Sequence, residues 1–79
     1  MSDGVMSAAV LAELVQAGEA ERLLAETEVG PTLYDGQWWY VPAHSPEGAD
    51  YIQADGELAE QFDRLRVRNQ AIADVEAMD

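Results

Sequence analysis

The spacing of apolar positions divides the chain into helical ends and an extended middle. Four apolar side chains recur at i, i+4, i+8 and i+11, the spacing of one helix face: Met6, Val10, Leu14 and Ala17. If that helix continued through Gly18, Glu21 would fall within the apolar stripe, because successive residues rotate by about 100°. The sequence therefore predicts two N-terminal helices, over residues 5–17 and 19–28, with a break at Gly18 and an end at Gly30-Pro31.

Residues 32–41 carry the strongest strand signal of the chain, a β-hairpin that turns at Asp35-Gly36. Asp-Gly between apolar and aromatic residues favours a type I′ turn, because that turn needs positive φ at both central positions. A two-residue loop here sets Leu33 opposite Trp38, with Thr32 opposite Trp39 and Tyr34 opposite Gln37.

Alternation along these strands makes both faces of the hairpin apolar. One face carries Leu33, Trp38 and Tyr40, and the other carries Tyr34, Trp39 and Val41. The first face is better suited to a core packed on the helices. The second then needs its own cover: another helix, another subunit or a partner protein, or else the C-terminal helix and the loops of the chain itself.

After a turn-rich loop, Tyr51-Ile52-Gln53 is a short candidate for a third strand, and a long helix is expected over about residues 56–77. Five residues of this helix follow one another at alternating spacings of four and three and so form one stripe, here called the seam: Leu58, Phe62, Leu65, Asn69 and Ile72. A buried asparagine within such a seam can fix the register and number of associating helices. Two interpretations stay open, a self-association seam between copies and an amphipathic helix that packs within its own chain.

Together these elements predict one small α+β domain over residues 1–79. It has two N-terminal helices, an aromatic β-hairpin and a long C-terminal helix. A chain of 79 residues is close to the lower limit for a self-sufficient hydrophobic core, and without cysteine it has no disulfide to help. Association, including a homodimer, is therefore an expected source of extra stability.

Charge narrows the range of partners. Sixteen acidic residues against four arginines, with no lysine, give a net charge of −12. Such a charge repels nucleic acid and anionic membranes and favours cationic partners. A GC-rich genome or adaptation to high salt would produce the same acidity without any functional meaning. No apolar run is long enough to span a membrane and the N-terminus lacks the basic start of a signal peptide, so we expect a cytoplasmic protein.

The residues that carry most enzyme chemistry are scarce. There is no cysteine or lysine, one histidine and no phosphate-binding glycine loop. Ser45 follows His44 directly, but adjacent residues are not a nucleophile–base pair unless a third group orients the base. His44, Glu47 and Asp50 have a spacing that could be written as a metal triad, yet a solvated turn explains it better. We expect no enzyme activity, no metal and no cofactor.

The order of helix, short helix and aromatic hairpin resembles a winged helix-turn-helix, in which the hairpin would be the wing. A DNA-reading member should carry Lys or Arg on its second helix and wing, because phosphate contacts dominate affinity. Here the second helix offers Arg22 among four glutamates, and the hairpin has no basic residue. Direct nucleic-acid binding is therefore not expected.

In composition alone, the chain resembles phage-encoded DNA-mimic inhibitors, immunity proteins and antitoxins, families that bind basic surfaces of nucleic-acid enzymes. We therefore expect a non-enzymatic module that binds a protein with a basic surface, with Trp39 as its aromatic anchor. The other expected contact residues are Tyr34, Asp35, Glu19, Glu21, Glu26 and Glu28. The alternatives are a homo-oligomeric structural or accessory module from a salt-adapted or GC-rich source, and a winged-helix-like regulator that acts through protein contacts.

Overall fold

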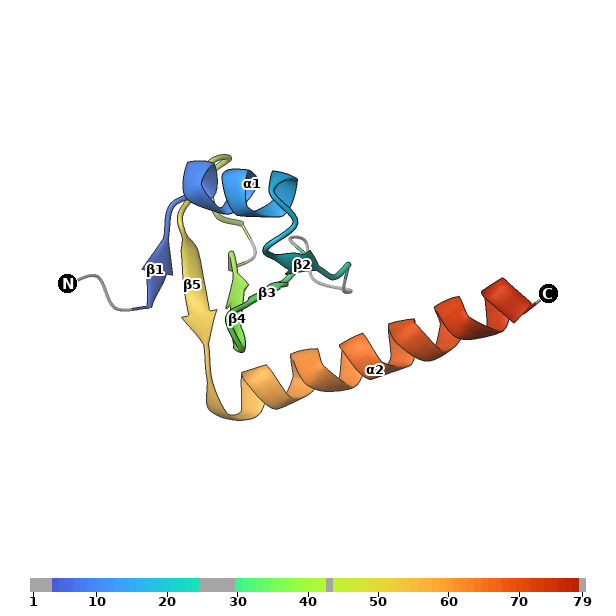
Figure 1. The fold of residues 1–79 in the computed structure, drawn as a ribbon. Helices are drawn as coiled ribbons and strands as arrows, with labels where there is room; N and C mark the ends of the chain where they lie inside the picture. Colours follow the sequence, from blue (N-terminus) through green and yellow to red (C-terminus); the bar gives the residue numbers. More distant parts are fainter. Residues whose placement is uncertain (1–3, 25–29, 43, 79) are drawn as a thin grey trace.

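The computed structural model describes residues 4–24, 30–42 and 44–78. Their elements are β1 (Val5–Met6), α1 (Ala8–Gln16), β2 (Glu21–Arg22), β3 (Thr32–Tyr34), β4 (Gln37–Tyr40), β5 (Tyr51–Ala54) and α2 (Gly56–Met78). The strands form one antiparallel sheet in the order β1-β5-β4-β3-β2 (Figure 1). The predicted α+β class and the long C-terminal helix are confirmed, and the predicted third strand is present as β5.

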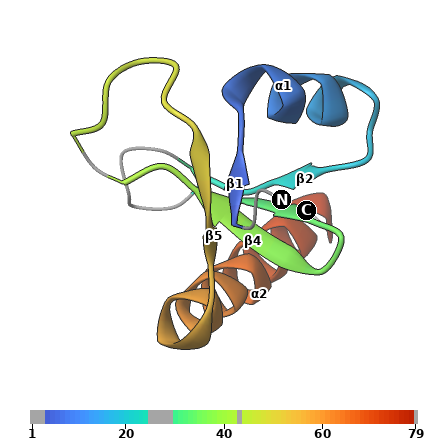
Figure 2. The ribbon, with the colours of Figure 1, turned by 90° about the vertical axis from the view of Figure 1, so that its left-hand side faces the viewer.

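The two helices lie on opposite sides of the sheet (Figures 1 and 2). Side chains alternate across a strand, and directly paired residues share a face. The observed pairs therefore place Leu33, Trp38 and Ala54 on the face toward α2. The face toward α1 carries Arg22, Thr32 and the residues paired with them on the neighbouring strands.

The hairpin forms as predicted. Leu33 pairs with Trp38, Thr32 with Trp39 and Tyr34 with Gln37. Asp35 and Gly36 have φ angles of 52° and 75°, the positive values that a type I′ turn requires. Turn chemistry and alternation, both local signals, were sufficient to fix this register.

The predicted break at Gly18 is also confirmed, and hydrogen bonds explain both ends of α1. Ser7 caps the start, because its hydroxyl accepts a hydrogen bond from the Val10 amide at 3.2 Å. At the other end the Gly18 amide donates to the Val15 carbonyl at 3.1 Å, and the Glu19 amide donates to the Leu14 carbonyl at 2.9 Å. These two bonds form a Schellman motif, with Gly18 at φ 79°.

The prediction of a second N-terminal helix over residues 19–28 is wrong. Glu21 and Arg22 form β2, which pairs with Leu33 and Thr32 of β3. The Leu23 amide then donates to the Pro31 carbonyl at 2.9 Å, so the edge pairing extends past the strand. Residues 25–29 lie outside the described part of the chain.

The first helix is also shorter than predicted. Val5 and Met6 are not helical but form β1, which pairs with Ile52 and Tyr51 of β5. These two residues add a strand at one edge of the sheet, as β2 does at the other. The partners of β1 lie far away in the sequence, whereas those of β2 lie in the next strand along the chain.

The core lies between the sheet and the first half of α2. Phe62 is 2% exposed and meets Trp38 and Tyr40 edge-on, at ring-centroid distances of 5.6 and 5.8 Å. The Trp38 indole Nε1 donates to Asp63 Oδ1 at 2.7 Å, which gives its polar atom a partner on the same helix. Leu23 completes the buried cluster from beyond β2. The predicted assignment of the Leu33 and Trp38 face to the core is confirmed.

Candidate binding surfaces

An acidic hollow of about 520 Å³ lies between the connection from α1 to β2 and the turn of the hairpin. Three carboxylates from these two segments line it, those of Glu19, Glu21 and Asp35. The rest of the lining is small or apolar: Gly18, Ala20, Leu33 and Gly36. We call these seven residues the acidic hollow.

The local fold explains why the carboxylates converge. The Schellman motif at Gly18 reverses the chain, so that β2 runs antiparallel to β3 with Glu21 opposite Leu33. Extending that register by two residues brings Glu19 level with Asp35, which is held at the exposed hairpin turn. Three carboxylates along one hollow give it a negative potential, which attracts a cation.

One of the three carboxylates also has a cationic neighbour within the chain. Glu21 accepts two hydrogen bonds from Arg66 of α2, at 3.1 and 3.3 Å, and both side chains are about half exposed, at 54% and 44%. A surface pair of this kind contributes at most about 1 kcal/mol. Two of the three carboxylates therefore share no ion pair with a described residue, and the third, that of Glu21, is held in place by Arg66.

The structure brings together only some of the contact residues that the sequence predicted. Glu19, Glu21 and Asp35 share the acidic hollow, whereas Glu26 and Glu28 lie outside the described residues. The remaining two, Tyr34 and Trp39, lie on the other face of the hairpin.

Trp39 is partly buried on the side of the sheet that faces α1. Its indole Nε1 is buried, and no hydrogen-bond partner for it is found in the described part of the chain. Tyr34, on the same face, is also partly buried. The role of Trp39 as an anchor stays a prediction.

Four of the five residues predicted for the α2 seam contact their own chain. Phe62 is buried, and Leu58 and Leu65 pack against the same core. The Asn69 amide Nδ2 donates to the Leu24 carbonyl at 3.1 Å. Ile72 is the exception, being 50% exposed. If two copies associate through α2, the contact must use other positions as well.

Such positions exist on the opposite side of α2. Val67, Ala71, Val75 and Met78, here named the outer stripe, follow one another at spacings of four, four and three residues. They lie roughly 140–180° around the helix axis from Phe62. Val67 is 66% exposed, Val75 67% and Met78 85%. The seam predicted from the sequence does not include this second stripe, although the spacing of its residues is visible in the sequence.

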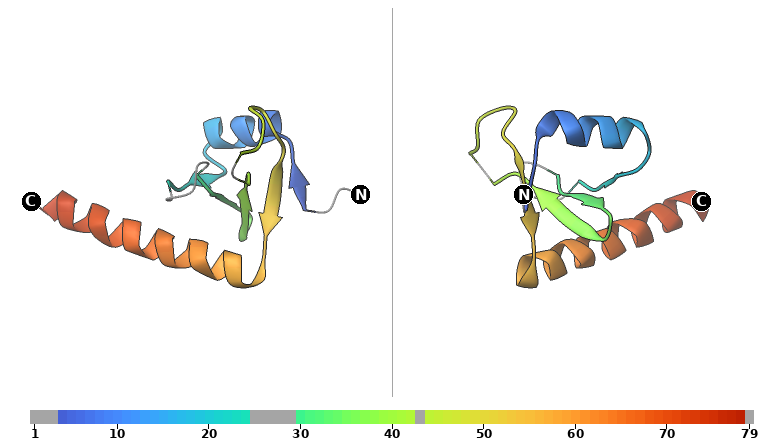
Figure 3. Two further views of the ribbon diagram at one scale, coloured as in Figure 1. Left: turned by 180° about the vertical axis from the view of Figure 1, so that it is seen from behind. Right: turned by 60° about the vertical axis from the view of Figure 1, so that its left-hand side comes forward.

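The last part of α2 extends beyond the sheet, as both views of Figure 3 show. Asn69 is the last residue of the helix with a described hydrogen bond to another element, and residues 70–78 are all exposed. The molecule is accordingly elongated, with extents of 45 × 28 × 23 Å. A helix segment that its own chain does not cover presents the outer stripe to solvent.

Comparison with known proteins gives no relative: no protein-family model, curated protein or solved structure matches the chain. Among the described residues, no helix has the length and apolar character needed to cross a membrane. Within that same part of the chain, no three His, Cys, Asp or Glu side chains are grouped closely enough to hold a metal ion.

Proposed function

We propose that this chain is a non-enzymatic protein-binding module whose acidic hollow receives an arginine or lysine side chain from a basic partner surface. The observation that carries the proposal is the convergence of Glu19, Glu21 and Asp35 on one hollow from two separate segments. Arginine suits such a hollow best, because its planar guanidinium makes paired hydrogen bonds to carboxylates.

The net charge of −12 supports the same proposal at longer range. A field of one sign raises the rate at which an oppositely charged protein is encountered, while the local contacts decide how long it stays. The hollow thus supplies the specificity that a diffuse acidic surface lacks.

The partner class that we propose is a protein that acts on nucleic acid, since such proteins carry the basic surfaces that a chain of this charge would occupy. The module would then act as an inhibitor or antitoxin, and the cytoplasm is the compartment that we propose for it. We do not propose a winged-helix-like regulator, because that alternative required a helix over residues 19–28, and Glu21 and Arg22 form β2 instead.

An NMR titration with a hexa-arginine peptide tests where a basic ligand binds. We expect the largest amide shift changes at Gly18, Glu19 and Gly36, which line the hollow. The shifts should shrink as added salt brings the screening length below about 10 Å. Equal shift changes along α1, the hairpin and α2 would show binding by net charge alone and would contradict the proposal.

A second candidate function is self-association through the outer stripe of α2, and the order of charges along the helix favours it. Arg64, Arg66 and Arg68 precede the middle of the stripe, whereas Asp74 and Glu76 follow it. In an antiparallel pair of helices centred on Ala71, Val67 of one copy meets Val75 of the other. The arginine-bearing part of each helix then lies beside the acidic end of its partner.

Sedimentation equilibrium separates this candidate from the first. A homodimer would have twice the 8.6 kDa mass of the chain. Added salt should strengthen self-association, because it screens the repulsion between two copies of charge −12, but it should weaken binding to a basic partner. Val75→Asp should abolish the dimer, whereas Ala77→Asp, an equal charge change on another face of the helix, should not. A monomer at every salt concentration excludes this candidate.

A further inference from the structure

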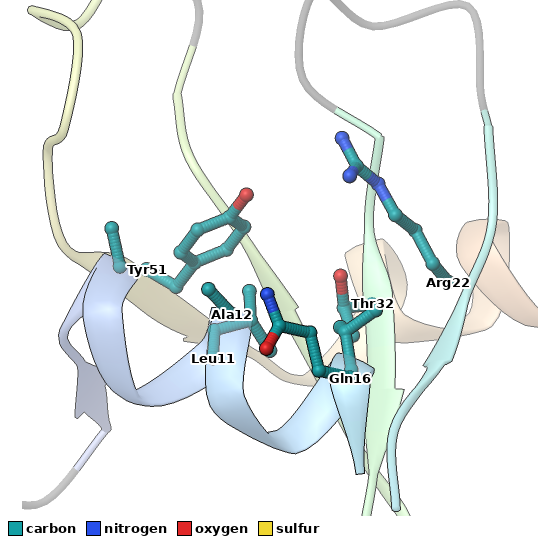
Figure 4. A pocket seen from close by; sticks show the side chains of 8 residues that line it. Leu11, Ala12, Gln16, Arg22, Thr32 and Tyr51 are labelled. Carbon is teal, nitrogen blue, oxygen red and sulfur yellow. The ribbon is translucent and has the colours of Figure 1, made fainter. Parts of the chain in front are cut away.

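A cavity of about 280 Å³ lies between α1 and the sheet, away from both surfaces described above (Figure 4). One part of its lining is apolar and comes mainly from α1: Ala8, Leu11, Ala12 and Val15. The other part is polar and comes from the end of α1 and three strands: Gln16, Arg22, Thr32 and Tyr51.

The polar groups of this cavity are gathered rather than scattered. Arg22 pairs with Thr32 across β2 and β3, so both side chains emerge on the α1 side of the sheet. In Figure 4 the Arg22 guanidinium, the Thr32 hydroxyl and the Tyr51 hydroxyl extend toward the same end of the cavity. In that view Leu11 and Ala12 lie below the Arg22 guanidinium and the Tyr51 hydroxyl.

Thr32 is the most unusual of these residues. It is 1% exposed, and its hydroxyl oxygen is buried without a hydrogen-bond partner in the described part of the chain. A buried hydroxyl without a partner loses its hydration and gains nothing in return. It lines the cavity, where a bound molecule with a polar atom would give it a partner.

Arg22 fixes the sign of the charge that this cavity accepts. Among the described residues it is the one charged residue in the lining, and its side chain forms no hydrogen bond or ion pair with any of them. In a chain with sixteen acidic residues and four arginines, a cavity whose single charge is positive runs against the composition. A guanidinium beside a hydroxyl donor is suited to a carboxylate, which accepts from both.

We propose that the α1 cavity binds a small organic carboxylate with a short apolar chain. The carboxylate accepts hydrogen bonds from Arg22 and Thr32, and the apolar chain lies against Leu11 and Val15. The volume limits the ligand, because about 280 Å³ corresponds to roughly nine water molecules. A short organic acid fits within this volume, and an organic cation would be repelled by Arg22.

A titration with hexanoate, followed by NMR on the intact chain, tests this proposal. We expect shift changes confined to α1, β2, β3 and the start of β5. Acetate, which lacks the apolar chain, and hexanol, which lacks the carboxylate, should each bind about tenfold more weakly or not at all.

Two variants with a matched control identify the groups responsible. Arg22→Gln should weaken hexanoate binding by about tenfold or more, while Arg64→Gln, the same charge change on exposed α2, should leave it unchanged. Thr32→Val should also weaken binding, and the proton spectrum of each variant shows whether it is folded. Failure of hexanoate to bind at millimolar concentration, or equal binding by folded Arg22→Gln and Arg64→Gln, overturns the proposal.

Discussion

Replacing Phe62 with alanine should cost more stability than any change on the exposed part of the same helix. Phe62 is 2% exposed, and its ring meets those of Trp38 and Tyr40 at interplanar angles of 62° and 64°. The substitution removes both edge-to-face contacts and leaves a cavity where α2 rests on the sheet.

The expected loss follows from these contacts. A buried Phe→Ala change costs about 3–5 kcal/mol, and each edge-to-face pair accounts for roughly 0.5–1.5 kcal/mol of it. At about 0.05–0.15 kcal/mol per residue, a domain of 79 residues has a total stability of about 4–12 kcal/mol. Phe62→Ala therefore removes a large fraction of the free energy of unfolding.

Urea unfolding followed by tryptophan fluorescence measures this loss, because Trp38 lies directly against the altered site. Val75→Ala is the matched control on the same helix, and with Val75 67% exposed it should change stability by no more than about 0.5 kcal/mol. Equal effects of the two substitutions would refute the reasoning. So would a Phe62→Ala loss that disappears on dilution, because Phe62 would then belong to a contact between copies.

Substitutions at three further positions test other parts of the fold by the same unfolding measurement. Gly30→Ala should destabilise by about 1–3 kcal/mol, because a Cβ there would lie 2.6 Å from the Leu23 carbonyl oxygen; wild-type stability would show that the backbone approach is not close. Asp63→Ala should cost about 1–3 kcal/mol by leaving the buried Trp38 indole N–H unpaired, while Asp63→Asn, which keeps an acceptor oxygen, should cost less; equal losses would argue against that hydrogen bond. Thr32→Val should raise the stability of the ligand-free protein by about 1 kcal/mol, and a loss would mean that its hydroxyl has a partner.

The parts of the fold that the sequence predicted correctly are those encoded by neighbouring residues. Asp35-Gly36 determines the turn, and the alternation beside it sets the pairing of Leu33 with Trp38. The long apolar stripe of α2 likewise needs no distant information, and the break at Gly18 follows from a glycine that ends a helix. Each of these signals lies within a few residues of the feature that it predicts.

The two edge strands could not be predicted in this way. β1 and β2 are two residues long, too short for an alternating pattern, and each is defined by partners elsewhere in the chain. Leu23 lies within the range predicted as the second helix, over residues 19–28, yet it is buried from an extended segment. Tertiary pairing decided the structure there, against the local pattern.

The candidate sites depend on those same strands. Glu19, Glu21 and Asp35 were each predicted as contact residues, but only the pairing of β2 with β3 brings them to one hollow. The α1 cavity depends on β2 as well, since Arg22 faces Thr32 only in that register. Neither arrangement follows from a helix over residues 19–28.

The most direct test of the proposed function compares two variants of equal charge. Glu19→Gln with Asp35→Asn removes two carboxylates from the acidic hollow, and asparagine tolerates the positive φ of residue 35. Glu13→Gln with Glu60→Gln removes two exposed carboxylates from α1 and α2. We predict that the first pair weakens hexa-arginine binding by about tenfold more than the second. Equal weakening would show that the peptide responds to net charge alone, and the hollow would not be a binding site.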